Sequence, residues 1–308
     1  MTYQYSFKDC LQRAERITWR VEDLIGGDKT LDFSRPFLPE TFARTEALSF
    51  LNAAEKRTLN HIRGHAYLAM FGLVEEFILP FMLAHARPLI IKPMHAGDDY
   101  KARAFLEFAS EEAKHIHLFR SFRRDFIENF GVQCDVIGPA EDISAHVLAQ
   151  PPLSVALLTL QIEWMSQAHY LGSAKDDDAL DPQFKSLLLH HWMEEHQHAQ
   201  LDALMTLSIA EALSPAEVEA GIDGYIALGG FFDAGLKQQT AFDLDALQRA
   251  TGRSFSDSER DVFMTQQLQA NRWTYLGSGM SHPRFLEVVE QISPDKRREI
   301  EALVPTFS

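Results

Sequence analysis

Two short motifs in the sequence place a glutamate three residues before a histidine. Glu112 and His115 form the first Glu-x-x-His motif, and Glu195 and His198 form the second. Three positions on an α-helix turn the chain by about 300°, so the two side chains of each motif lie about 60° apart on one face. A carboxylate and an imidazole at this spacing can bind one cation together.

The residues around both motifs indicate that the motifs face the protein core. The same helix faces carry Phe105, Phe108, Ala109, Ile116 and Phe119 at the first motif, and Leu187, Leu188, Leu201 and Met205 at the second. An unpaired carboxylate or imidazole in apolar surroundings is strongly destabilising. A bound divalent cation neutralises the carboxylate and satisfies the imidazole nitrogen. One isolated copy would be interpreted as a solvated ion pair, but two copies on apolar faces predict metal ligands.

Two further apolar segments contribute core glutamates. Glu163 stands alone in one segment, while Glu75 and Glu76 are adjacent in the other. Glu76 is favoured as the inward residue because its face carries the small residues Ala69 and Gly72, which would leave room for a substrate. Glu75 remains the alternative inward residue. Single-glutamate helices interleaved with Glu-x-x-His helices are the pattern of ferritin-like dimetal carboxylate bundles.

His191 extends the second motif toward the N-terminus. It precedes Glu195 by four residues and His198 by seven, so the three side chains share one stripe of a helix. A third imidazole can therefore join the same pair of ions. The alternative is a core histidine that bonds a backbone carbonyl.

Other polar residues near the motifs are assigned outer roles. Asp202 continues the stripe of His191 and is expected to hydrogen-bond a ligand imidazole, with a structural salt bridge as the alternative. Glu111 and Glu194 lie further round their helices and are interpreted as outer partners of the ligands or as surface groups. Three further histidines are interpreted as solvent-facing or structural: His117, His190 and His196.

Helical periodicity dominates the elements that must position these residues, and no convincing run alternates as a strand would. The predicted fold class is all-α, a ferritin-like four-helix bundle with additional N- and C-terminal helices. The expected helices cover about residues 7–24, 47–86, 99–130, 140–149, 153–174, 182–213, 215–238, 257–276 and 283–291, with a last one from residue 294. Arg87-Pro88 is expected to end the second helix, and a loop is expected at 93–97. One domain over 1–308 is predicted, with the bundle core at about 47–213 and a helical extension at about 214–308.

Composition and charge narrow the function classes. The 308 residues are 46% hydrophobic and 24% charged, which is typical of a globular protein. A formal net charge of −15 disfavours nucleic acid and anionic membrane surfaces as partners. Two cysteines, Cys10 and Cys134, are too few and too far apart for a disulfide framework or a cysteine metal site.

The location expected from the sequence is the cytoplasm. Residues 1–25 carry charged side chains throughout and lack the apolar core of a signal peptide. The apolar stretch 66–84 contains Glu75, Glu76 and Pro80 near its centre. Carboxylates are costly in lipid, so this stretch is interpreted as a helix buried in protein.

On these motifs the chain resembles the ferritin-like non-haem di-iron oxidases and oxygenases. Within that superfamily, His191-x-x-x-Glu195-x-x-His198 is similar to the para-aminobenzoate N-oxygenase group, whose fourth helix carries an additional histidine ligand. The resemblance covers about residues 47–213 and implies these ligands: Glu76, Glu112, His115, Glu163, His191, Glu195 and His198. The run from Glu75 to Pro80 is also similar to acyl-carrier-protein desaturases, where a ligand glutamate stands four residues before a proline, and this supports Glu76.

The resemblance implies an oxygenase that activates O₂ at two iron ions, Fe/Fe or Mn/Fe, to oxidise a small organic substrate, with N-oxygenation of an amine as the specific reaction. It also implies an electron donor, either a reductase or a ferredoxin, and it is compatible with a homodimer. Carbon-centred oxidation by a fatty-acyl-type desaturase or hydroxylase is the alternative in the same class. Ferritin-like metal storage and a radical-generating subunit, with Tyr170 as the radical site, are the rivals from other classes.

Overall fold

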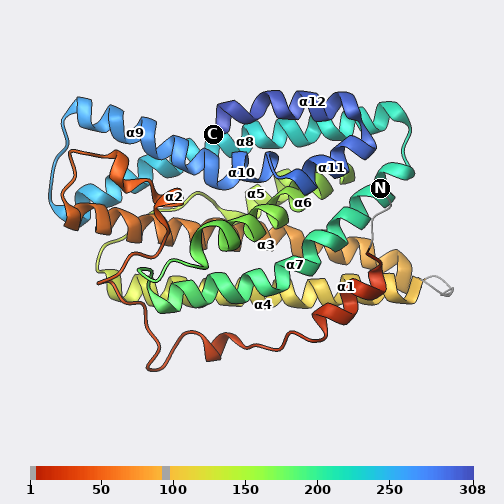
Figure 1. The fold of residues 1–308 in the computed structure, drawn as a ribbon, viewed down its shortest axis with the longest axis horizontal. Helices are drawn as coiled ribbons and strands as arrows, with labels where there is room; N and C mark the ends of the chain where they lie inside the picture. The colour runs from red at the N-terminus through yellow and green to blue at the C-terminus, as the bar shows by residue number, and fades with distance from the viewer. Residues whose placement is uncertain (1–4, 92–97) are drawn as a thin grey trace.

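The computed structural model describes residues 5–91 and 98–308, and it consists of helices joined by loops (Figure 1). The four longest helices of the expected core are α3 (Ala53–Ile91), α4 (Asp98–Phe130), α6 (Pro152–His169) and α7 (Pro182–Glu211). The remaining α-helices are α1 (Phe7–Ala14), α2 (Glu40–Ala43), α5 (Ala140–Leu148), α8 (Pro215–Thr251), α9 (Asp257–Arg272), α10 (Ser278–Met280), α11 (Pro283–Ile292) and α12 (Pro294–Leu303). The described ranges contain no β-strand, so the predicted all-α fold is confirmed. The loop expected at 93–97 lies outside the described residues.

The core helices pack in pairs. α3 packs along α4, α6 packs along α7, and α4 also contacts α7. α1 packs across α4 and α7, while α8 covers α3 and α6 from the other side. Figure 1 shows the C-terminal helices α8 to α12 as an upper layer, with α1 and α4 at the opposite edge. The residues before and after the core helices therefore cover the core from two sides.

Local capping signals fix where several helices begin. The Asp181 side chain accepts a hydrogen bond of 2.6 Å from the backbone of Phe184 at the start of α7, as the Asp-Pro sequence predicted. Ser214 and Glu217 form a capping box at the start of α8. Gly131, with φ of +80°, follows the last residue of α4, as expected for a helix-ending glycine.

The boundaries expected for α3 are wrong at both ends. Asn52 caps the helix by accepting hydrogen bonds from the backbones of Ala54 and Glu55, at 2.9 and 3.1 Å, so α3 begins at Ala53 rather than near residue 47. At the other end, α3 continues through Pro88 to Ile91. A proline there leaves one carbonyl of the preceding turn unpaired, and the exposed surface of this turn lets water satisfy it.

Two other predicted boundaries also differ. The first helix ends at Ala14, and a short 3₁₀ turn at Val21–Asp23 follows it. α8 extends to Thr251, well beyond the expected residue 238, and ends at Gly252 with φ of +66°. The third core helix and the helix expected at 257–276 do reach about their expected ends, but their last turns are π-helical, at Tyr170–Ala174 and Trp273–Gly277. Hydrophobic periodicity did not set the ends of α1 and α8, because each depends on a hydrogen bond at one turn.

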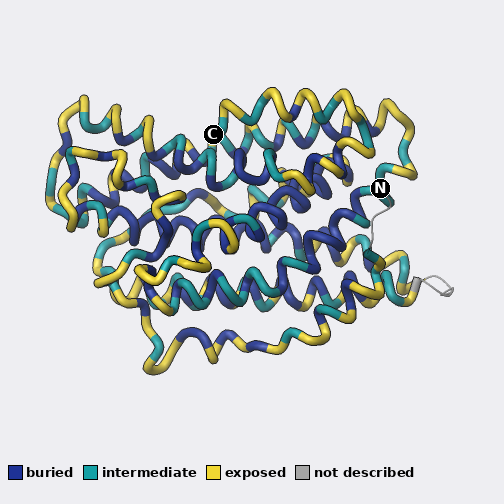
Figure 2. Tube along the Cα trace, in the orientation of Figure 1, coloured by how far each residue is buried: buried dark blue, intermediate teal, exposed yellow. Residues whose placement is uncertain are grey.

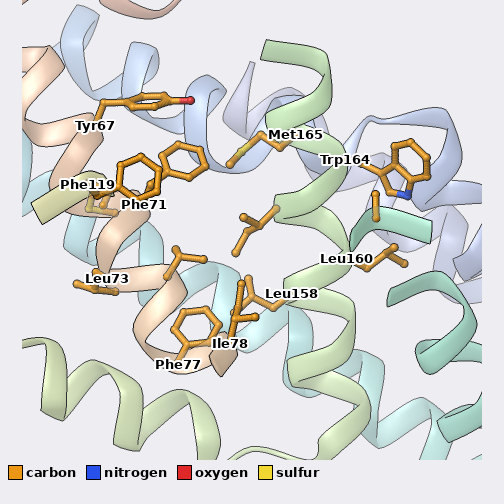
Figure 3. Close-up of a cluster of buried hydrophobic side chains, with 14 of the residues drawn as sticks. Tyr67, Phe71, Leu73, Phe77, Ile78, Phe119, Leu158, Leu160, Trp164 and Met165 are labelled. Carbon is orange, nitrogen blue, oxygen red and sulfur yellow. The ribbon is translucent and has the colours of Figure 1, made fainter. Parts of the chain in front are cut away.

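The core lies between α3 and its neighbours, and Figure 2 shows the central helices as the most buried part of the trace. In Figure 3, Phe71 and Phe77 of α3 lie near Leu158 and Met165 of α6. Within the described ranges, one helix, α3, is long and apolar enough by composition to cross a membrane, and 72% of its most apolar window is buried in the protein. This agrees with the prediction that α3 is a core helix.

Candidate metal centre

Six buried side chains form one continuous cluster of potential metal ligands. Glu112, His115, Glu195 and His198 place one ligand atom each within 4.8 Å of one another. Glu75, His115, His191 and Glu195 form a second group that meets the same limit. His115 and Glu195 belong to both groups, so the two groups are adjacent and share donors.

The donors come from different helices. α3 contributes Glu75, α4 contributes its Glu-x-x-His pair, and α7 contributes its own pair together with His191. Glu163 of α6 is 2% exposed and lies beside Glu195. A single glutamate from each of α3 and α6, with a Glu-x-x-His pair from each of α4 and α7, is the donor distribution of ferritin-like dimetal bundles.

His115 and His198 have the same orientation within the cluster. The Nε2 of His115 lies 2.9 Å from Glu194 Oε2, and the Nε2 of His198 lies 2.7 Å from Glu111 Oε2. Both Nδ1 atoms point inward and lie 3.1 Å from oxygens of Glu195. Metal-ligating histidines are usually held in this way, with the outer nitrogen donating to a carboxylate.

Glu111 and Glu194 are thus outer hydrogen-bond partners of the two histidines and not surface groups. Their side chains are buried, and each has a second partner. Gln197 Nε2 donates to Glu111 Oε1 at 3.2 Å, and Lys114 Nζ donates to Glu194. These contacts hold both carboxylates in place, which in turn orients the imidazoles.

His191 faces the carboxylates of the cluster. Its Nε2 lies 2.7 Å from Glu195 Oε1 and 3.2 Å from Glu75 Oε1. Its ring packs against Phe71 and Phe119, at centroid distances of 5.6 and 5.0 Å. The structure therefore places His191 where a third imidazole ligand was expected.

The expectation that Glu76 faces the cluster is wrong, because Glu75 occupies that position. The Glu76 side chain is 27% exposed and accepts a hydrogen bond of 2.6 Å from Arg120 Nη2. One residue rotates a helical side chain by about 100°, so the two glutamates cannot face the same site. The small residues beside Glu76 do leave space, but that space is a pocket on the outer side of α3, lined by Ala69, Gly72 and Glu76.

Asp202 also differs from its expected role. It is fully buried, and neither of its oxygens has a hydrogen-bond partner among the described residues. Asp202 was expected to bond a ligand imidazole, but the outer nitrogens of His115 and His198 are paired with Glu194 and Glu111 instead. Burial raises the pKa of Asp202 well above its ordinary value.

Electrostatic interactions couple the groups of the cluster. Burial alone would raise the pKa of Glu195, but the neighbouring groups, with His191 and His198 foremost, outweigh burial and lower that pKa well below the ordinary value. Burial raises the pKa of Glu163, and the adjacent negative charge of Glu195 raises it further. The pKa of His198 lies well above its ordinary value, because Glu195 and the other neighbouring carboxylates outweigh the effect of burial.

These donors fit a pair of divalent cations. Six buried atoms of the cluster have no hydrogen-bond partner among the described residues: Glu75 Oε2, both oxygens of Glu112, His115 Nδ1, Glu163 Oε2 and Glu195 Oε1. Several lie close to one another without hydrogen-bond geometry, as the 3.1 Å separation of His115 Nδ1 and Glu195 Oε1 illustrates. Cations would satisfy these atoms, and four ionised carboxylates would balance the charge of two divalent ions.

One neighbour of the cluster was not predicted from the sequence. The ring of Trp19 stacks on His115 at a centroid distance of 6.2 Å, and Lys114 Nζ lies 4.2 Å from the Trp19 centroid. Trp19 follows α1 in an irregular segment that the sequence predicted as helix. No local pattern could have found this contact, because it joins segments about a hundred residues apart.

Comparison with known proteins gives distant structural similarity only. No family model and no curated protein match the chain. Among solved structures, a mutant R2-like ligand-binding oxidase with an aerobically reconstituted Fe/Fe cofactor is 15% identical, with a TM-score of 0.49 over 88% of this chain and 94% of that one. Another mutant R2-like ligand-binding oxidase, with an anaerobically reconstituted Mn/Fe cofactor, is 14% identical, with a TM-score of 0.49 over 89% and 94%. At this level of similarity, the chain's own side chains must carry the assignment of its chemistry.

Proposed function

We propose that the protein is a non-haem dimetal oxidoreductase that uses two iron ions, or a Mn/Fe pair, to oxidise a small organic substrate with O₂. The observation that carries this proposal is the pair of overlapping donor groups that share His115 and Glu195. Mixed carboxylate and imidazole ligands suit iron and manganese. A metal pair held there would supply the reduction of O₂, while the surrounding helices exclude water from the site.

The proposed ligands combine the sequence motifs with the geometry of α3. They are Glu75, Glu112, His115, Glu163, His191, Glu195 and His198, with Glu75 in place of Glu76. Glu111 and Glu194 orient His198 and His115 and keep both Nδ1 atoms directed at the metals. The bonds that these outer carboxylates receive from Gln197 and Lys114 limit how far the imidazoles can turn.

Two features favour an enzyme over a metal storage protein. A pocket of about 370 Å³ lies against the outer side of α3 and reaches Phe119, whose ring contacts His191. The C-terminal helices add a layer over α3 and α6 that a storage bundle would not need. A small organic substrate is therefore the expected reactant beside O₂, and an external reductase or ferredoxin is the expected source of electrons.

Within this class we favour oxygen transfer to an amine nitrogen. The support is the third imidazole, His191, which stands in the spacing of the N-oxygenase-like motif and contacts Glu195 and Glu75. Carbon-centred oxidation is the alternative. Testing arylamines and fatty-acyl compounds as substrates, with product mass as the readout, separates the two reactions. A mass increase from oxygen on amines favours the first, and loss of two hydrogens or hydroxylation of acyl chains favours the second.

Metal content tests the proposal directly. The purified protein should contain about two transition-metal ions per chain, mainly iron, and Glu112→Ala and Glu195→Ala should lower that number. Reduced protein should then consume O₂ in the presence of substrate. Less than one ion per chain, unchanged by either substitution, would remove the proposal, and many iron ions per chain would favour storage.

A further inference from the structure

The outer pocket beside the metal centre is the strongest feature that the cluster itself does not explain. It lies between α3, α4 and the segment 136–140, and its volume is about 370 Å³. Its apolar walls include Leu68, Leu73, Phe119, Val136 and Ile137. Two arginines, Arg120 and Arg123, also line it.

One aromatic side chain separates this pocket from the cluster. His115, Phe119 and Arg123 follow one another at intervals of four residues, so they share one stripe of α4. Phe119 lines the pocket and also packs against the His191 ring at 5.0 Å. The helical rise places Arg123 about 12 Å beyond His115 along α4. The pocket therefore begins next to the cluster and extends away from it toward Arg123.

The two arginines differ in how they are paired. Arg120 Nη2 donates to Glu76 at 2.6 Å, and Glu76 is an acidic side chain of the same pocket. Arg123 is half-buried, and its Nε has no hydrogen-bond partner among the residues that the structure describes. Burial lowers the pKa of Arg123, the nearby charge of Glu76 partly opposes that shift, and the guanidinium remains charged at neutral pH. A cation partly withdrawn from water and without such a partner favours an anion as its ligand.

We propose that this pocket binds a small organic monoanion, with its charged group on Arg123 and its apolar body extending toward Phe119 and the metal centre. The apolar walls accommodate a hydrocarbon body, and a guanidinium binds a carboxylate with charge-assisted hydrogen bonds. Glu76 places a negative charge in the same pocket, which disfavours a ligand with two charges. That the anion is the substrate rests on the proposed function, whereas its binding to Arg123 does not.

Binding to metal-free protein tests the site independently of the metal. Hexanoate and hexanamide have nearly the same shape and differ in charge, and calorimetric titration would measure the affinity of each. Hexanoate should bind about tenfold or more tightly than hexanamide. Arg123→Gln should weaken hexanoate about ten- to hundredfold and leave hexanamide unchanged, because a hydrogen bond to a charged group is lost. Arg124→Gln, at an exposed position of the same helix, is the matched control and should change neither affinity.

Equal affinities for the two probes, or an Arg123→Gln variant that binds hexanoate as the unaltered protein does, would overturn the proposal. Arg123→Gln should fold normally, because it removes a partly buried cation that has no hydrogen-bond partner at Nε. Ala69→Phe provides a second variant, since it fills the pocket from α3 without changing its charge. It should abolish binding of both probes, and unchanged hexanoate binding would place the anion elsewhere.

The orientation of the anion can be measured with Mn²⁺ added to the protein. A paramagnetic ion at the cluster should broaden the NMR signal of the terminal methyl group of hexanoate more than that of the CH₂ next to the carboxylate. The reverse order would refute the orientation toward Phe119. If Mn²⁺ binds no more tightly to this protein than to Glu112→Ala, the metal proposal fails, and the result from metal-free protein still decides the anion site.

Discussion

The two adjacent glutamates of α3 provide a stringent test of the metal centre. Glu75→Gln and Glu76→Gln make the same chemical change at neighbouring positions, but only Glu75 faces the cluster. Glu75 is 3% exposed and lies 3.2 Å from His191, whereas Glu76 is paired with Arg120 at the outer pocket. We expect Glu75→Gln to lower the metal content from about two ions per chain toward one and Glu76→Gln to leave it unchanged.

The magnitude follows from the charge of the cluster. Four ionised carboxylates would balance two divalent ions, so removing one leaves an uncompensated positive charge in a buried site. Two unit charges 4 Å apart interact by about 4 kcal/mol at an effective dielectric constant of about 20, which corresponds to roughly a thousandfold loss of affinity. Glu76→Gln removes an ion pair whose arginine is 62% exposed, so its effect on folding stability should stay below about 1 kcal/mol.

Anaerobic titration with Fe²⁺, followed by gel filtration and elemental analysis, would measure both variants. Thermal unfolding of metal-free protein is the control for stability. If Glu76→Gln loses metal and Glu75→Gln does not, α3 is rotated by one residue relative to the structure. If both variants keep two ions, α3 contributes no ligand and the inward orientation of Glu75 has another cause.

Three further predictions follow from the structure. His191→Ala should keep the fold and most of the metal, because six proposed ligands remain, but it should change the absorption and EPR spectra of the iron-loaded protein. His190→Ala should change neither spectrum, and identical behaviour of the two variants would make His191 a structural residue. Glu111→Gln should weaken metal binding by about ten- to a hundredfold, since Glu111 holds the outer nitrogen of His198, while Glu107→Gln one turn earlier should have no effect in the same titration. Burial lowers the pKa of His61 from 6.5 to about 4, so the stability that depends on its neutral imidazole is fully present above pH 6.5, and about 3 kcal/mol of it is lost as the pH falls to 4. Urea unfolding of the metal-free protein and of metal-free His61→Asn, above pH 6.5 and at pH 4, should show that the variant loses less stability by about that amount. An equal loss in the two proteins would refute the effect assigned to His61.

The sequence alone determined the fold class and predicted most of the side chains that lie together at the proposed metal centre. Both Glu-x-x-His motifs lie on faces whose other residues are apolar, so the local period was enough to predict that they point inward. The same period placed His191 with Glu195 and His198, and the structure brings these three side chains together. Helix starts with strong capping residues, such as Asp181 and Ser214, were predicted correctly because their signals are local.

Tertiary packing decided what the local pattern left open. α3 is apolar on nearly every side, so its sequence does not fix its rotation, and the choice of Glu75 over Glu76 depends on how α4, α6 and α8 pack around it. The position of Glu111 beside His198 likewise depends on the distance between α4 and α7. Because Glu111 bonds the outer nitrogen of His198, Asp202 does not take the role expected for it. The pocket at Arg123 exists because α3, α4 and the segment 136–140 meet there. Helical periodicity reports which side of one helix is apolar, whereas the contacts that select a ligand or a partner arise only when separate helices are brought together.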